Sequence, residues 1–295
     1  MSEILLIGGS NVDYIATSRD KLIPKTSNIG IISISSGGVM RNVTYNLANL
    51  GNKCHFITAI GKDSDGDKII QELEDKNVSV YTPLSSLPTS KYVAMNDNNH
   101  DMITAICDNR IINDLTLNFV LNNKELINKF EYIILDSNLS EPFISDLYHE
   151  FWDKKFIVEA ISRVKVRRFI PFLKNTYLVK CNIFEAKEIV GDDSLDGEEL
   201  LDKFIELGIK NAVISRGGDS ILFIDNLKKG EVKLEKQTNF KNTTGCGDDL
   251  FSGIIDSLMQ KKSLKEAIEF GVKLSTLTLF DEKACSDSIQ QFKHE

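Results

Sequence analysis

The sequence predicts an α/β fold in which helices sandwich a doubly wound, mostly parallel sheet, with a small antiparallel β lid beside it. Three observations support this prediction. Short apolar and often β-branched runs alternate with segments of helical periodicity through most of the chain. Glycine turns follow several of these runs, where the strands of a parallel sheet would end. Two other strand-like stretches interrupt the alternation and predict the lid.

The expected core strands are compact apolar runs. They lie at Ile4–Ile7, Phe56–Ile60, Tyr132–Leu135, Phe156–Val158, Tyr177–Val179 and Ala212–Ile214. Helices are expected where apolar residues share one helical face, at Val43, Leu47 and Leu50, at Leu250, Ile254 and Leu258, and over the amphipathic segments Asp65–Lys76 and Glu198–Leu207. Strands and helices that alternate in this way predict a parallel sheet.

The lid is expected from about residues 14–36 and 89–108. Ile29–Ser35 and Ser90–Cys107 are strand-like, and the turn-rich Asn96–Asp101 divides the second stretch. A β flap of this kind could close over a ligand and exclude water, although the pattern fits a hairpin without such a role equally well. No repeat or linker divides the chain, so we expect one domain over residues 1–295.

Composition and charge argue against several classes of partner. The 295 residues are 42% apolar and 26% charged, with a formal net charge of −8. A negatively charged protein is poorly suited to bind nucleic-acid phosphates or anionic lipids. Five scattered cysteines without metal-ligand spacing fit a reducing cytosol, and no apolar run approaches the ~18 residues of a membrane span. We therefore expect a cytoplasmic protein with no nucleic-acid or membrane partner.

The most informative motif is N-T-T-G-C-G-D, from Asn242 to Asp248, directly before an apolar helical segment. Its glycines let the backbone approach a ligand, and free N–H groups at a helix N-terminus form an anion site suited to a phosphoryl group. Asp248 could accept the proton of an attacking hydroxyl beside that site. Helix capping is an equally good explanation of Asp248 from this motif alone.

Other polar groups follow expected strands. The motifs are G-G-S-N-V-D at Gly8–Asp13, S-G-G-V-M-R-N at Ser36–Asn42, K-C-N-I-F-E at Lys180–Glu185 and S-R-G-G at Ser215–Gly218. Asp13 could hold a diol at the carboxyl edge of the sheet, and Asn182 with Glu185 could position Mg²⁺-bound water or phosphate oxygens. Each motif taken separately could be an ordinary turn or cap. P-loop, dinucleotide-binding and protein-kinase motifs are absent from the sequence.

Taken in order, these motifs, together with the turn from Gly61 to Gly66, resemble the ribokinase-like, or PfkB, carbohydrate kinases over nearly the whole chain. Within that family, G-G-V-x-R-N at Gly37–Asn42 is similar to the branch that phosphorylates the nucleoside pseudouridine. Three further stretches and one residue resemble the same branch: Thr26–Gly30, Asp136–Leu139, Ile161–Lys165 and Asn242. The chain departs from the family pattern at Glu159, Cys181, Ser220 and Cys246, and a thiol at Cys246 could make activity sensitive to oxidation.

The resemblance implies a role for each motif. Asp248 would be the catalytic base, and the backbone of Gly245, Cys246 and Gly247 would form the anion hole. Substrate would be bound by Asn11, Asp13, Gly37, Gly38, Arg41, Asn42, Asn138 and Lys165, of which Arg41, Asn138 and Lys165 would face the base. ATP would be bound by Asn182, Glu185, Ser215, Gly217, Thr244 and Ser275, with Asn182 and Glu185 organising Mg²⁺ through water.

The activity implied by the resemblance is transfer of the ATP γ-phosphate to the 5′-hydroxyl of pseudouridine, with Mg²⁺ and a possible role for a monovalent cation. The lid could also join two copies of the chain in a homodimer. Two alternatives remain open. One is a kinase of the same family that acts on another nucleoside or on a free sugar such as ribose. The other is a catalytically silent ligand-binding protein of the same fold, which would have no need for Asp248, Asn182 and Glu185 together.

Overall fold

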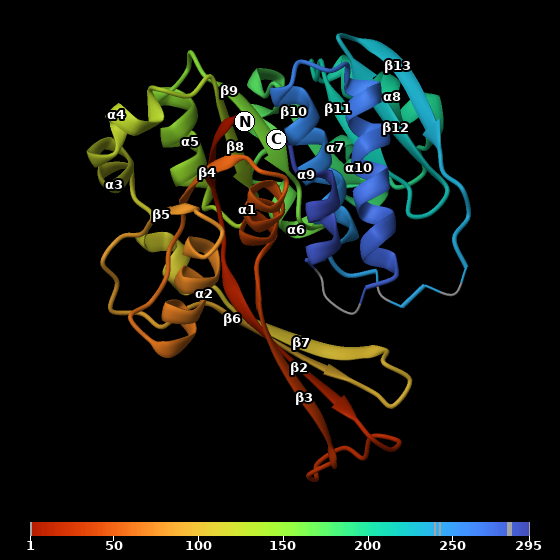
Figure 1. Ribbon diagram of the computed structural model, residues 1–295. Coiled ribbons are helices and arrows are strands. Elements are labelled where there is room, and N and C mark those ends of the chain that lie inside the picture. Colours follow the sequence, from red (N-terminus) through yellow and green to blue (C-terminus); the bar gives the residue numbers. More distant parts are fainter. Residues whose placement is uncertain (1, 239, 242, 282–284, 295) are drawn as a thin grey trace.

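The computed structural model describes residues 2–238, 240–241, 243–281 and 285–294, and a nine-stranded sheet forms the centre of this part of the chain (Figure 1). The strand order is β13-β12-β11-β10-β9-β8-β1-β4-β5. The strands are β1 (Glu3–Ile7), β4 (Lys53–Ile57), β5 (Ser79–Tyr81), β8 (Tyr132–Asp136), β9 (Lys155–Glu159), β10 (Leu178–Asn182), β11 (Ala212–Ser215), β12 (Ser220–Asp225) and β13 (Lys228–Lys233). Neighbours from β5 to β11 pair in parallel, whereas β12 and β13 are antiparallel. The predicted mostly parallel sheet is therefore confirmed.

Helices cover both faces of this sheet. One face is covered by α1 (Val39–Asn49), α2 (Ser64–Glu74), α9 (Cys246–Met259) and α10 (Leu264–Leu279). The other is covered by α3 (Leu117–Asn122), α4 (Lys124–Ile127), α5 (Glu141–Glu150), α6 (Arg163–Val166), α7 (Ile183–Val190) and α8 (Gly197–Glu206). Short 3₁₀ segments lie at Arg110–Asp114, Ile170–Asn175 and Asp287–Phe292. Successive strand residues such as Leu5 and Leu6 belong to the cores on opposite faces, as the alternation along a strand requires.

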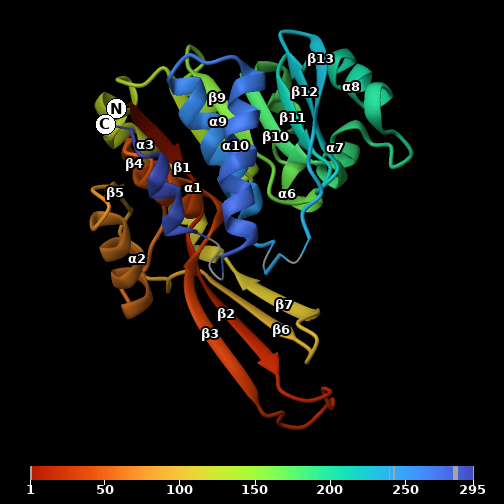
Figure 2. The ribbon, with the colours of Figure 1, turned by 45° about the vertical axis from the view of Figure 1, so that its right-hand side comes forward.

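The expected lid is a separate four-stranded sheet that projects from one edge of the sandwich (Figures 1 and 2). Its order is β3-β2-β6-β7, with bounds β2 (Asn11–Ser18), β3 (Gly30–Gly37), β6 (Lys91–Asn96) and β7 (Met102–Asp108). Both hairpins are antiparallel as expected, but β2 and β6 pair in parallel. The chain enters β2 after β1 and enters β6 after β5, so both strands leave the core in the same direction.

Asp63 ties the root of the lid to the core. One of its carboxylate oxygens caps α2 by accepting from the Gly66 amide at 2.8 Å, and the same oxygen accepts from the Thr89 hydroxyl at 2.7 Å. The other oxygen accepts from the Thr89 amide at 2.8 Å, just before β6 begins. The expected turn from Gly61 to Gly66 therefore fixes where the lid leaves the sandwich.

No helix within the described residues is both long and apolar enough to span a bilayer.

Candidate active site

The N-terminus of α9 is a glycine turn built as the sequence predicts. Gly245 adopts a positive φ of 88°, and the structure shows no side-chain cap for the helix that follows. The first N–H groups of a helix lack partners within it, so such a turn can bind an anion. Burial raises the pKa of the Cys246 thiol to about 11, which opposes formation of the reactive thiolate. Asn242, which begins the predicted motif, lies outside the described residues.

Asp248 faces α1. Asn42 Nδ2 donates a hydrogen bond to Asp248 Oδ2 at 2.8 Å, which joins two motifs that lie far apart in the sequence. The residue that caps α9 is Gly245, so the carboxylate of Asp248 is not the helix cap that was the alternative. Removal of the carboxylate from water raises the pKa of Asp248 to about 6. Asn42 and Lys180 lower this pKa, and Asp136 and Asp13 raise it by smaller amounts.

The expected substrate residues at the start of β2 lie against the start of α1. Asn11 donates to Asp13 Oδ1, and a Cβ on Gly37 would lie 2.2 Å from Asp13 Oδ2. Gly38 has a φ of 97°, and a Cβ there would lie 2.7 Å from the Cα of Ser10. The glycine pair therefore lets β2 and α1 approach each other closely, and burial raises the pKa of Asp13 beside them.

Asn138 and Lys165, two of the expected substrate residues, are in direct contact. Lys165 Nζ donates to Asn138 Oδ1 at 2.6 Å. Asp136 fixes the backbone on which Asn138 stands, because its oxygens accept hydrogen bonds from the amides of Gly9 at 3.0 Å and Asn138 at 2.9 Å. Sequence reasoning did not assign Asp136 a role, although its place at the end of a buried strand could have indicated one. Burial is the main reason that its pKa is raised.

Arg41 is buried and already engaged. Its guanidinium pairs with Glu72 at 2.6 Å and lies 4.7 Å from the centroid of the Tyr45 ring. The Nε atom is buried without a hydrogen-bond partner among the described residues. A ligand contact by Arg41 would therefore use Nε or require the ion pair to rearrange.

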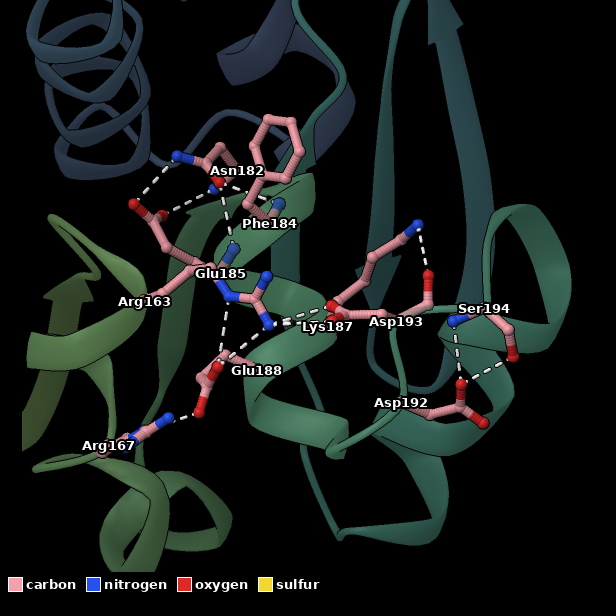
Figure 3. A network of polar contacts seen from close by, with 10 residues as sticks. All are labelled: Arg163, Arg167, Asn182, Phe184, Glu185, Lys187, Glu188, Asp192, Asp193 and Ser194. Carbon is pink, nitrogen blue, oxygen red and sulfur yellow. Dashed lines mark hydrogen bonds and ion pairs between the residues drawn. The ribbon is translucent and has the colours of Figure 1, made fainter.

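The expected nucleotide-binding residues gather at the ends of β10 and β11. Asn182 pairs with Ser215 across these strands. Asn182 and Glu185 form a capping box at the start of α7, in which the Asn182 amide and Nδ2 each donate to Glu185 at 2.8 Å (Figure 3). Gly217 follows with a φ of 62° and open space beside it.

The other two expected nucleotide residues lie on the α9 side. The turn formed by Gly245, Cys246 and Gly247 is called the anion turn below. The Ser275 side chain, on α10, hydrogen-bonds with Cys246 in this turn. Thr244 is exposed immediately before the turn.

The donor set suits Mg²⁺ bound through water. No cluster of three or more carboxylate, histidine or cysteine side chains that could enclose a metal occurs among the described residues. Each oxygen of Glu185 accepts one hydrogen bond from Asn182. Because a carboxylate oxygen has two lone pairs, each oxygen can still accept a bond from a bridging water. Mg²⁺ commonly keeps several waters and binds mainly to the phosphates of a nucleotide, so this arrangement is compatible with the expected ion.

Ion pairs behind the capping box join α7 to α6, the helix that carries Lys165 (Figure 3). Arg163 of α6 and Arg167, the residue that follows this helix, both pair with Glu188 of α7, at 3.1 Å and 2.5 Å. These ion pairs therefore link the helix that carries the expected substrate residue Lys165 to the helix that carries the expected nucleotide residue Glu185. A surface hollow of about 280 Å³ lies at the opposite ends of the strands, where β1 and β8 begin at Glu3 and Tyr132, and contains none of the expected site residues.

Several known proteins are similar to this chain over most of its length. The model of the pfkB family carbohydrate kinases matches residues 1–291. The chain is 29% identical to the pseudouridine kinase of Escherichia coli K12 over 282 residues, covering 94% of this chain and 90% of that protein. It is 27% identical to the guanosine-inosine kinase of Exiguobacterium acetylicum, covering 93% of each. The crystal structure of a ribokinase from Thermotoga maritima superposes with a TM-score of 0.84 at 20% identity, covering 99% of both chains, and shows the same fold.

The motifs, the fold and the family match over residues 1–291 agree. The chain belongs to the pfkB family of carbohydrate kinases, whose members use ATP to phosphorylate sugars and nucleosides.

Proposed function

We propose that this kinase transfers the γ-phosphate of ATP to the 5′-hydroxyl of a nucleoside, and that the nucleoside is pseudouridine. The observation that carries the proposal is the Asn42–Asp248 hydrogen bond, because it joins an expected substrate residue to a carboxylate at the start of α9. The similarity to a pseudouridine kinase and to a guanosine-inosine kinase supports a nucleoside acceptor.

The chemistry follows from the position of Asp248. Its carboxylate would accept the proton of the attacking 5′-hydroxyl, and the amides of the anion turn would stabilise charge on the transferring phosphoryl group. Asp13 and Asn42 would hold the ribose. Bound Mg²⁺ would supply neutralising charge at the phosphates, and closure of the lid would exclude the water that otherwise hydrolyses ATP.

Recognition of the base would depend on Arg41, Asn138 and Lys165. Because Lys165 Nζ donates to Asn138 Oδ1, it fixes which side of the amide points to the site. The Lys165 ammonium has further donors for the carbonyl oxygens of a uracil ring. This pair favours a pyrimidine-like base over a free sugar, which would leave both groups without a ligand.

A coupled ADP-release assay tests the proposal across pseudouridine, uridine, adenosine, ribose and fructose 6-phosphate. We expect the highest kcat/KM with pseudouridine. A higher value for another nucleoside would replace the base in the proposal and retain the reaction, and turnover of ribose alone would identify a sugar kinase. The absence of turnover with every acceptor would favour the silent-protein alternative.

We also propose that two copies pair through the lid. Its strands expose apolar side chains that no helix of the described chain covers, namely Ile31, Ile32, Ile34, Val93, Met95, Ile103 and Ile106. Ile32→Asp should then shift the protein from dimer to monomer in size-exclusion chromatography with light scattering. Leu84→Asp is the matched control, because Leu84 is exposed but lies outside the lid strands. A monomeric wild-type protein would contradict this proposal.

A further inference from the structure

A buried ion pair lies at the end of the sheet beside the anion turn. Glu159 and Lys180 are paired across β9 and β10, and Lys180 Nζ donates to Glu159 Oε1 at 2.6 Å. Both side chains are about 95% buried, with exposed fractions of 6% and 5%. The second oxygen, Glu159 Oε2, is buried and has no hydrogen-bond partner among the described residues.

The ammonium of Lys180 borders the backbone of the anion turn. A Cβ placed on Gly247 would lie 3.3 Å from Lys180 Nζ, so the ammonium lies in close contact with the backbone at the start of α9. Asp248 is the next residue, and Lys180 stabilises its ionised form. The structure therefore places a positive charge directly against the backbone to which a phosphoryl group is expected to bind.

Stability does not explain this pair well. The cost of removing two charges from water usually cancels most of their attraction, and apolar residues of similar volume often serve the fold as well. Here the pairing is also incomplete, because one buried oxygen of Glu159 is left without a partner. An ammonium has three donors, and among the described residues Lys180 makes one hydrogen bond, to Glu159.

We propose that Lys180 binds the γ-phosphoryl group of the nucleotide at the α9 turn, and that Glu159 holds the ammonium within reach before the nucleotide arrives. This inference rests on the proposed use of ATP and adds a phosphate-binding residue to that site. The backbone amides of the turn supply partial charges only, whereas Lys180 supplies a full one. Its contact would strengthen as negative charge gathers on the transferring group.

The test compares two variants that share one background. Glu159→Gln removes the carboxylate but keeps the lysine, and the double variant Glu159→Gln with Lys180→Met removes both charges at similar volume, so neither leaves an unpaired buried carboxylate. Dissociation constants are measured by titration calorimetry with Mg²⁺ for ADP and for the β,γ-imido analogue of ATP. Lys187→Met is the matched control, because Lys187 lies on α7 near the site but donates to the Asp193 carbonyl (Figure 3).

We expect the double variant to bind the ATP analogue ~10–100-fold more weakly than Glu159→Gln does, while its affinity for ADP stays within about threefold. Lys187→Met should change neither affinity. A double variant that loses affinity equally for both nucleotides, or for neither, would overturn the inference and leave the proposed function intact. A wild-type protein that binds neither nucleotide would overturn both.

Discussion

Replacing Asp248 by asparagine separates its chemical role from its structural one. The substitution removes the proton acceptor but keeps a side chain of the same shape, whose oxygen can still accept the hydrogen bond from Asn42. General-base catalysis contributes ~10²–10⁴-fold, so kcat should fall by that factor. The backbone of Gly245 and Gly247 is unchanged, so the affinity for the β,γ-imido analogue of ATP should stay within about threefold.

The same variant should be more stable than the wild-type protein. The pKa of Asp248 rises from an ordinary 3.8 to about 6. A carboxyl group with a raised pKa lowers the free energy of unfolding at a pH where the group is ionised in both the folded and the unfolded state. At about 1.4 kcal/mol per pKa unit, this cost is roughly 3 kcal/mol at pH 8. An asparagine does not ionise, so the variant avoids most of this cost, and its advantage should shrink as the pH falls through 6.

The assays are ADP release, analogue binding and urea unfolding at pH 8 and pH 5. Asp192→Asn is the matched control, because it removes one charge from an exposed carboxylate whose hydrogen bonds among the described residues go to nearby Ser194. It should leave kcat and stability almost unchanged. A kcat of Asp248→Asn above a tenth of the wild-type value would refute the role as base, and a parallel loss of analogue binding would show that the residue maintains the turn instead.

Three further predictions concern pH, specificity and the glycine turn. First, kcat/KM should rise with pH through about 6 and then level off, because Asp248 must be ionised to accept a proton; a profile that is flat from pH 5 to 8 would contradict this. Second, Arg41→Ala should raise the KM for the nucleoside more than it lowers activity toward ribose, and equal effects on both acceptors would count against a base-side role. The same variant loses the ion pair with Glu72, so its free energy of unfolding should fall by about 1–3 kcal/mol. Third, Gly38→Ala should lower the free energy of unfolding by at least ~1–3 kcal/mol, because a Cβ would meet Ser10, and an unchanged urea midpoint would show that the turn can relax.

The sheet was largely predictable because its parallel strands are short, apolar and separated by helices. The hairpin of β12 and β13 at the edge was not predicted. β13 reads K-K-G-E-V-K, and its side chains are mostly exposed, so hydrophobicity gives little sign of a strand there. It forms because Phe223 and its neighbours on β12 supply the pairing edge, which the local sequence of β13 does not contain.

The site was predictable where its groups lie inside glycine motifs, and not where strand pairing creates them. Asp248 and Asn42 stand in recognisable motifs, and the structure brings them within 2.8 Å. Glu159 and Lys180 are separated by a helix and a loop in sequence, and only the alignment of β9 with β10 makes them partners. Spacing along the chain cannot reveal such a pair, because it depends on which strands become neighbours.

Burial of the carboxylate, with smaller contributions from two neighbouring carboxylates, brings the pKa of Asp248 close to neutrality, where it can act as a base. Asp13 and Asp136 each raise the pKa of Asp248, while Asn42 and Lys180 lower it. A fully compensated carboxylate would be a weaker base, and an uncompensated one would be protonated at pH 7 and unable to accept a proton. The balance leaves the pKa just below neutrality, at a cost in stability that the fold accepts at its reacting centre. Removal of Asp136 should therefore lower the pH at which catalysis begins, and removal of Lys180 should raise it.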